Sequence, residues 1–312
     1  MYWKHKALLM KACASLPRGD VLYRLGQKKF GNVNGNPLAK IQYHIELVRR
    51  LLKAGFLIED HDFMEVGTGH IPILPICFVL SGARSVVTVD LHRKLDFGLL
   101  RETLRYFKEK RSDIESMYAG TVRQSVLDEG FALIDKLGHV PRDFLEEGRI
   151  RYLAPADATE SGLPAASVDY HFSYTVLEHI PHEVLKRLFQ ETVRVLRRRG
   201  IAIHSVDPSD HFQQMDTSIP KINFLRYTDK EWHRIAGNQF SYHNRLRLSD
   251  YRVLFEEFFE ILDMETDIDE DCVRVLKSGF PLAERFKPYS FEDLCCTSLH
   301  ATLRPKHVES SR

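Results

Sequence analysis

Cysteine is scarce in this sequence of 312 residues and follows neither a disulfide nor a metal-binding pattern. The cysteines are odd in number, and no two have CxxC spacing: Cys13, Cys77, Cys272, Cys295 and Cys296. These features argue against a disulfide framework and against a cysteine-based zinc site. They fit a reducing compartment.

A long apolar run and a large net charge are also missing. The most apolar stretch, residues 71–83, is too short to span a bilayer and contains Pro72 and Pro75. Met1–Lys6 leads into no apolar segment of the kind that a signal peptide has. The formal net charge of +1 gives no electrostatic reason to expect nucleic acid or an anionic membrane as a partner, and a solvated turn explains the basic run Arg197–Arg199. We therefore expect a cytoplasmic protein with a small-molecule substrate and no nucleic-acid or membrane partner.

The sequence does contain a regular alternation of short apolar strands and helices. Residues 1–60 are predicted to be helical, since Ile41, Ile45 and Val48 recur at helical spacing. Candidate strands then follow at 63–66, 85–90, 149–153, 168–172, 201–206, 260–265 and 298–303. Strands that alternate with helices predict an α/β fold with a doubly wound, mostly parallel sheet of seven strands. No helix-only crossover precedes the last strand, so that strand is expected to be antiparallel.

Two segments are longer than usual connections: a helical insertion at 91–148, and a segment at 207–250 that is rich in Asp, His, Arg and aromatic residues. We expect three parts, namely an N-terminal helical cap or lid (1–60), an α/β ligand-binding domain (61–305) and a tail (306–312). Within the cap, Gln27–Lys29 and the Gly/Asn-rich joint at 31–36 are candidates for a lid hinge. An ordinary loop is the alternative.

A glycine loop follows the first predicted strand, with the sequence Glu65-Val66-Gly67-Thr68-Gly69. Glycines permit a tight turn that a ligand can approach, because a Cβ would block the turn or the contact. Asp90 ends the second strand, where its carboxylate can accept hydrogen bonds from both hydroxyls of a ribose. Loop and acid together predict a site for an adenosine-containing ligand.

Two other interpretations of this loop stay open. Gly67 and Gly69 can simply form a sharp turn, with Asp90 as an exposed strand end. A dinucleotide site normally requires GxGxxG, whereas His70, Ile71 and Pro72 follow Gly69. There is then no third glycine at a helix N-terminus for a pyrophosphate.

With these features the sequence resembles the class I (Rossmann-like) methyltransferases that depend on S-adenosylmethionine (SAM), of the methyltransferase-11-like, small-molecule biosynthetic type. Glu65–Gly69 is similar to their first motif, Asp90 to their ribose-binding acid, Ala156–Ala158 to their adenine-binding segment, and Ser173–Pro181 to their motif after the fourth strand. The resemblance covers residues 60–305 and implies SAM as methyl donor or as the substrate itself. It implies that SAM is held by Glu65, Gly67, Thr68, Gly69, His70, Asp90, Leu91, Asp157, Ala158, Ser173 and Tyr174. His70 in place of the usual third glycine, with Pro72 and Pro75 after it, departs from the family pattern.

Polar side chains also follow the fourth and fifth strands, at the edge where doubly wound sheets bind ligands. In methyl transfer the enzyme aligns the nucleophile and, where needed, removes its proton. The candidate catalytic residues are His211, Asp207, Asp210, His179 and Tyr174. The alternative for His179 and its neighbour Glu178 is to cap a helix or line the cofactor pocket. His204, Asp207, Asp210 and His211 also permit a metal site, but their spacing matches no firm motif, and we predict no metal.

Aromatic and basic residues are predicted to contact the substrate: Tyr23, Arg226, Tyr227, Tyr242, Asn244 and Arg245. Tyr227 and Tyr242, with Trp232 and Phe240, can form an apolar or cation-binding wall. Arg226 and Arg245 can clamp a carboxylate. The alternatives are helix packing for Trp232, which follows the predicted capping box Thr228–Glu231, and surface ion pairs for the arginines.

Three functions are compatible with these residues. The first is SAM-dependent methyl transfer to a small molecule in an enclosed site. The second consumes SAM without methylation, as in cyclisation to azetidine-2-carboxylate with release of methylthioadenosine. The third is a non-catalytic SAM-binding partner protein, which predicts a degraded loop, whereas Glu65, Gly67, Gly69, Asp90 and Asp157 are all present.

Overall fold

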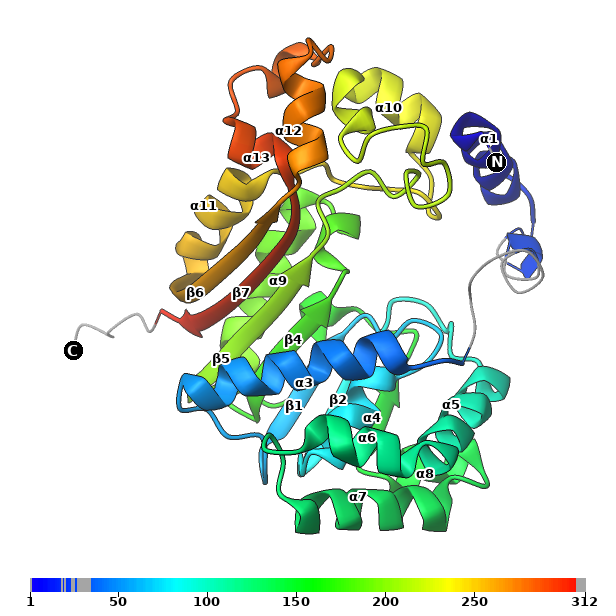
Figure 1. Cartoon of the computed structure of the whole chain (residues 1–312), viewed down its shortest axis with the longest axis vertical. Helices are drawn as coiled ribbons and strands as arrows, with labels where there is room; N and C mark the ends of the chain where they lie inside the picture. Colours follow the sequence, from blue (N-terminus) through cyan, green and yellow to red (C-terminus); the bar gives the residue numbers. More distant parts are fainter. Residues whose placement is uncertain (1, 18, 20, 24–25, 27–34, 307–312) are drawn as a thin grey trace. The chain divides into compact units, whose positions relative to one another are not determined.

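A computed structural model describes residues 2–17, 19, 21–23, 26 and 35–306. Gln27, Lys28 and Lys29 of the predicted lid, residues 31–34 of its joint and the tail 307–312 lie outside the described residues. The chain divides into two compact units (Figure 1). The glycine-loop unit comprises 34–173 and 190–202, and the histidine unit comprises 1–33, 174–189 and 203–312.

The seven strands form one sheet in the order β3-β2-β1-β4-β5-β7-β6. Their bounds are β1 Asp62–Val66, β2 Ser85–Val89, β3 Ile150–Leu153, β4 Val168–Tyr174, β5 Leu196–Val206, β6 Phe259–Ile268 and β7 Cys296–Pro305. β1, β2 and β3 pair in parallel, and β6 and β7 pair antiparallel. The predicted doubly wound, mostly parallel sheet with an antiparallel final strand is therefore confirmed.

In the glycine-loop unit, register brings the carboxyl ends of neighbouring strands to one edge. Val66 of β1 lies opposite Val89 of β2 and Ser173 of β4, and Val89 lies opposite Leu153 of β3. The loops that follow β1, β2 and β3 therefore leave the sheet together, at the edge where such sheets bind ligands.

The helices of this unit cover the strands with apolar side chains. They are α3 Leu38–Lys53, α4 Ile73–Leu80, α5 Phe97–Glu109, α6 Arg111–Tyr118, α7 Gln124–Leu137 and α8 Pro141–Glu147. All eight residues of α4 are buried, so the most apolar stretch of the sequence is a core helix. α5 to α8 pack against one another (Figure 1) and form the predicted helical insertion.

The histidine unit surrounds a second core. Its helices are α1 Trp3–Ala14, the N-terminal half of α9 His182–Val195, α10 Asp229–Ala236, α11 Leu248–Phe258, α12 Glu270–Lys277 and α13 Phe291–Cys295. Figure 1 shows α11 beside β6. Trp3, Ala7 and Met10 of α1 are buried among side chains from residues 212–236, with the Trp3 ring 5.4 Å from that of Phe212.

The basic run Arg197–Arg199 does not form the solvated turn that we predicted, because it begins β5. Arg197 donates hydrogen bonds to Asp169 of β4 (2.6 Å) and to Asp62 of β1 (3.0 Å). The run was misread because the partners that draw Arg197 into the sheet are distant in sequence. No helix among the described residues is long and apolar enough to cross a membrane.

Candidate active site

The glycine loop adopts a backbone that other residues avoid. Gly67 has φ 92° and Gly69 has φ 66°, both in the left-handed region. The Gly67 N–H donates to the carbonyl of Val89 (2.8 Å), which fixes the loop to the end of β2. A Cβ built on Gly69 would meet no atom within 4 Å. Glycine is thus required here by conformation, and the space beside Gly69 is open to a ligand.

Asp90 ties this loop to the end of β2. Its Oδ2 accepts from the Gly69 N–H and its Oδ1 accepts from the His92 N–H, each at 2.9 Å. The carboxylate is 8% exposed. Each of its oxygens retains a second lone pair, so the orientation that the backbone imposes is compatible with accepting bonds from a diol.

Glu65 and Thr68 turn inward from the same loop. Thr88 donates to Oε2 of Glu65 and lies 2.5 Å from the Thr68 hydroxyl, and all three side chains are buried. Burial raises the pKa of Glu65 to about 7, while Thr88 and the half-buried Lys40 act in the opposite direction. Glu65 therefore supports the loop from inside the protein.

Replacing Glu65 with glutamine is expected to flatten part of the pH dependence of stability. The native carboxyl keeps its proton to about pH 7, whereas the unfolded chain loses it near the ordinary pKa of 4.5. The stability from Glu65 is thus fully present below pH 4.5 and is lost as pH rises through 7. Urea unfolding at about pH 5 and about pH 8 should show this loss in the wild type and less of it in Glu65→Gln. Glu109→Gln, at an exposed glutamate, is the matched control. If the free energy of unfolding changed equally with pH in all three proteins, Glu65 would not be the source of the pH dependence.

The other predicted cofactor residues, except Tyr174, lie around this loop or on adjoining turns of the same unit. His70 Nδ1 lies 3.2 Å from the Lys94 carbonyl, and Leu91 is 61% exposed. Asp157 is exposed and caps the short helix that starts at Ala158, accepting from the Thr159 N–H at 2.8 Å. Ser173 is buried at the end of β4, and Tyr174, which follows it, belongs to the histidine unit.

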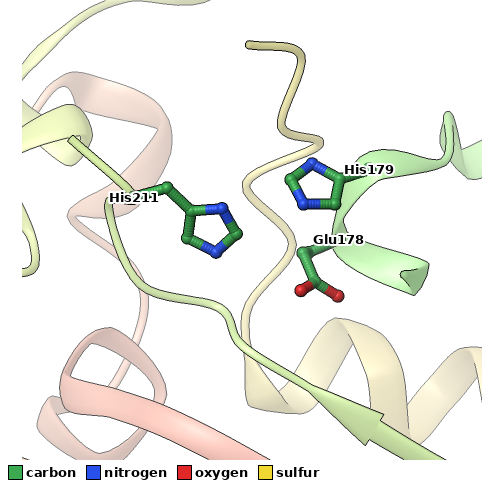
Figure 2. Close-up of side chains that lie close together, drawn as sticks. All are labelled: Glu178, His179 and His211. Atoms are coloured by element: carbon green, nitrogen blue, oxygen red, sulfur yellow. The ribbon is translucent and has the colours of Figure 1, made fainter. Parts of the chain in front are cut away.

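In the histidine unit, Glu178, His179 and His211 lie together (Figure 2). Glu178 and His179 belong to the turn after β4, and His211 to the segment after β5. The imidazoles of His179 and His211 are 5.0 Å apart between centroids, and that of His243 lies 5.3 Å from His211. Burial raises the pKa of Glu178 to about 8. Three imidazoles and a buried carboxyl therefore meet at one place.

Backbone atoms fix the protonation of two of these imidazoles. His179 Nδ1 lies 2.9 Å from the Tyr242 carbonyl, which can only accept, so Nδ1 carries the proton. His243 Nδ1 accepts from the Arg245 N–H at 2.9 Å, so its proton is on Nε2. Burial, with His211, His179 and Arg247 nearby, holds the pKa of His243 well below its usual range. His243 is therefore neutral.

The predicted catalytic aspartates differ in environment. Asp207 Oδ2 is 3.4 Å from His211 Nε2, without the alignment of a hydrogen bond. Burial alone would lower the pKa of His211, but Asp207, with smaller contributions from Glu178 and Asp210, raises it. Asp210 is buried and accepts from the Phe212 N–H and the Asn223 amide. Asp207 thus lies next to the His211 imidazole, whereas Asp210 stabilises the segment after β5 through its hydrogen bonds.

Tyr174 and His204 lie at the two strand ends. Tyr174 is half-buried, and its phenol pKa is raised by burial and by the charges of Asp207 and Glu178. His204, which the alternative metal pattern included, is fully buried, with its ring 5.6 Å from Phe189 and 6.1 Å from Phe255. His204 therefore packs among aromatic side chains and does not join the cluster of Glu178, His179 and His211.

A pocket of about 60 Å³ opens beside His179, His211 and His243. Its other lining residues are Lys6, Met10, Asp210, Phe212, Phe224, Trp232, Phe240 and Ser241. Trp232 is 6% exposed, and its indole N–H has no hydrogen-bond partner among the described residues. The pocket is therefore aromatic, with imidazoles at one side and an indole donor on its wall.

The predicted substrate residues divide between this pocket and the structure around it. Tyr23 stacks on the pocket residue Phe240 at 4.5 Å, and Tyr227 stacks on Trp232 at 6.0 Å. Tyr242 contributes its carbonyl to His179. Arg226 is exposed, with its guanidinium over the Phe280 ring.

Two residues predicted to contact the substrate hold the chain in place. The buried Arg245 donates to the carbonyls of Phe224 and Tyr227 and to Asp229, which is a structural arrangement rather than an open carboxylate clamp. Asn244 donates to the carbonyls of Leu177 and Ile180, at 2.8 and 2.9 Å, on either side of Glu178 and His179. Backbone and carboxylate partners use these donors in the structure, and contact of either residue with a substrate stays a prediction.

The sequence predicts neither Glu178 nor His243 as a catalytic residue, although both belong to the cluster. The available signal was the adjacency of Glu178 and His179 directly after a buried strand. No local pattern pointed to His243, which reaches the cluster through tertiary packing.

Comparison with known proteins gives one family match. Residues 139–204 match the methyltransferase-11 family, described as a methyltransferase domain. The match includes Asp157, Ser173 and the Glu178–His179 pair, while the glycine loop and Asp90 lie outside it. Over these residues it agrees with the resemblance drawn from the motifs. No curated protein sequence matches the chain.

Many solved structures are similar in fold. Magnesium protoporphyrin IX methyltransferase of Synechocystis PCC 6803 is 14% identical, with 91% of this chain and 94% of that chain covered and a TM-score of 0.44. A protein of Pyrococcus horikoshii OT3 is 14% identical (84% and 89% covered, TM-score 0.45). Geranyl diphosphate methyltransferase is 11% identical (84% and 85% covered, TM-score 0.44). Similarity at this level carries no information about the substrate.

Proposed function

We propose that this protein is a SAM-dependent methyltransferase that acts on a small molecule. The observation that carries the proposal is the loop at Gly67–Gly69, whose left-handed backbone leaves open space at Gly69 and is tied to the Asp90 carboxylate. A tight glycine turn beside an oriented acid, at the carboxyl ends of β1 and β2, is the arrangement that an adenosine ligand requires. The methyltransferase-domain match supports the same activity.

The residues of the glycine-loop unit fit SAM. Asp90 would accept from the ribose hydroxyls, and the exposed Asp157 would accept from the adenine amine. Gly67 and Gly69 would let the backbone approach the ligand, with exposed Leu91 and His70 beside them. SAM supplies an activated methyl group on a sulfonium, so the protein mainly has to position the acceptor.

The histidine unit supplies groups suited to an acceptor. His211 faces Asp207, an arrangement that can take a proton from a nucleophile near neutral pH. The aromatic pocket beside it buries an apolar acceptor, and the Trp232 indole can donate to a polar atom of that acceptor.

The aromatic, aspartate and histidine side chains that line the pocket are also compatible with an alternative function that needs no acceptor. In the alternative, the amine of SAM attacks its own γ-carbon, the carbon–sulfur bond breaks, methylthioadenosine leaves and the ammonium loses a proton. The product is azetidine-2-carboxylate.

Incubation with SAM alone, followed by mass spectrometry, tests both functions. For a methyltransferase we expect intact SAM, with S-adenosylhomocysteine formed only after an acceptor is added. Methylthioadenosine together with a cyclic amino acid would replace the methyltransferase assignment with the alternative. A protein that does not bind SAM at all, by calorimetry, would refute both.

A further inference from the structure

The side chains of Glu178, His179 and His211 each place one potential ligand atom within 4.8 Å of the other two (Figure 2). Two imidazoles and one carboxylate are a donor set that binds divalent transition ions. Both histidines also line the pocket, whereas Glu178 is fully buried behind them. The cluster therefore has an inner, enclosed side and an outer side that opens into the pocket.

Glu178 is a buried carboxyl without a partner. Its side chain is 0% exposed, and neither Oε1 nor Oε2 has a hydrogen-bond partner among the described residues. The backbone N–H groups of Glu178 itself and of Asp207 act on it, but neither forms a well-aligned hydrogen bond. Burying such a group without compensation is unfavourable. A cation between Glu178 and the imidazoles would supply the missing partner.

His179 is already oriented as a ligand. Its Nδ1–H donates to the Tyr242 carbonyl, so the lone pair of the ring is on Nε2. Histidines that bind metals usually donate their other N–H to a backbone carbonyl or a carboxylate in this way. Asn244 donates hydrogen bonds to the carbonyls on both sides of Glu178 and His179, which fixes these two potential metal ligands relative to each other. Asp207, 3.4 Å from His211, is placed to orient the third donor.

We propose that Glu178, His179 and His211 bind one divalent transition ion, with Zn²⁺ as the reference case. Ligand atoms bound tetrahedrally to such an ion are about 3.4 Å apart, so the three donor atoms, which lie within 4.8 Å of one another, would approach by up to roughly 1.4 Å to close the site. Three protein ligands leave a coordination position open, and the pocket lies on that side. The position suits an oxygen donor such as a hydroxyl or carboxylate, and with the ion bound His211 is a ligand instead of the proton acceptor described under the proposed function. This proposal replaces our expectation that the protein has no metal site.

The test is metal binding by the full-length chain in the absence of SAM. After treatment with EDTA and dialysis, calorimetry should show one Zn²⁺ per chain. The affinity for Zn²⁺ should fall on the order of 100-fold or more in each of three variants, Glu178→Gln, His179→Ala and His211→Ala. His182→Ala, a half-exposed histidine three residues from His179, is the matched control and should bind as the wild type does.

A misfolded variant is distinguished by circular dichroism and thermal unfolding. Glu178→Gln is nearly isosteric and removes an unpaired buried carboxyl, so it should fold even if a histidine variant does not. Failure of the wild type to bind stoichiometric Zn²⁺ would overturn the proposal. Undiminished binding by Glu178→Gln would do the same, because it would place the ion elsewhere in the protein.

Co²⁺ and acetohydroxamate test the ligands and the open position. The absorption spectrum of bound Co²⁺ should show d–d bands and no thiolate-to-cobalt charge-transfer band. Acetohydroxamate, a small chelator that binds through oxygen, should change the d–d bands. A thiolate band, or a spectrum insensitive to acetohydroxamate, would contradict the assignment. Because none of these measurements uses SAM, the metal site and the proposed methyl transfer can fail independently.

Discussion

Replacing Asp90 with asparagine is expected to weaken SAM binding by about 100-fold or more, because hydrogen bonds to a charged acceptor contribute about 1.5–3 kcal/mol each. The carboxylate now accepts from the N–H groups of Gly69 and His92 and is proposed to accept two ribose hydroxyls. An asparagine keeps one oxygen and places an amide N–H against one of those backbone donors. Calorimetric titration with SAM measures the loss.

The control for this change is Asp96→Asn. Asp96 belongs to the same unit and caps α5 through the N–H groups of Gly98 and Leu99. Asparagine is an equally good cap, so the variant removes one negative charge without disturbing the helix. It should bind SAM as the wild type does. Near-normal affinity in Asp90→Asn would refute the ribose assignment, and equal losses in both variants would point to net charge instead.

Truncating Asn244 to alanine is expected to destabilise the histidine unit by about 3 kcal/mol. The change removes the donors to the carbonyls of Leu177 and Ile180 and the acceptor for the N–H of Leu246. Buried polar groups left without partners account for most of the loss. Hydrogen exchange should accelerate in the turn that carries Glu178 and His179, because Asn244 is the side chain that holds it.

Asn238→Ala provides the comparison. The Asn238 side chain donates to the Ser241 hydroxyl and accepts from the Phe240 N–H, and among the described residues these partners lie within its own turn. Its truncation should cost less than about 1 kcal/mol and leave exchange in residues 176–182 unchanged. If both variants lose the same stability, or if exchange in that turn does not respond to Asn244→Ala, then Asn244 is not the residue that positions the cluster.

The sheet was predictable because its signals are local. Each strand is a short apolar run bounded by turn residues, and the helix from His182 has its apolar positions at regular spacing. The placement of Gly69 next to Asp90 followed from the same regularity, since parallel strands in register bring their carboxyl ends together. Propensity and spacing were sufficient for these features.

The histidine cluster was only partly predictable, because it is assembled from distant segments. His179 and His211 are separated by β5, and His243 arrives from beyond α10. Whether a polar side chain meets a ligand or a backbone carbonyl depends on the chain packed around it, as Arg245 and Asn244 illustrate. The same limit applied to Arg197, whose aspartate partners lie on other strands.

The burial of α1 has a consequence for how the molecule is made. Trp3, Ala7 and Met10 leave the ribosome well before residues 212–236, whose side chains cover them. The Trp3 N–H finds its acceptor, Asp216, 213 positions later in the chain. During synthesis the apolar face of this helix therefore stays uncovered until residues 212–236 have emerged. The wall of the pocket that Met10 provides is thus completed late, by a closure between distant parts of the chain, which is the slow kind of folding step.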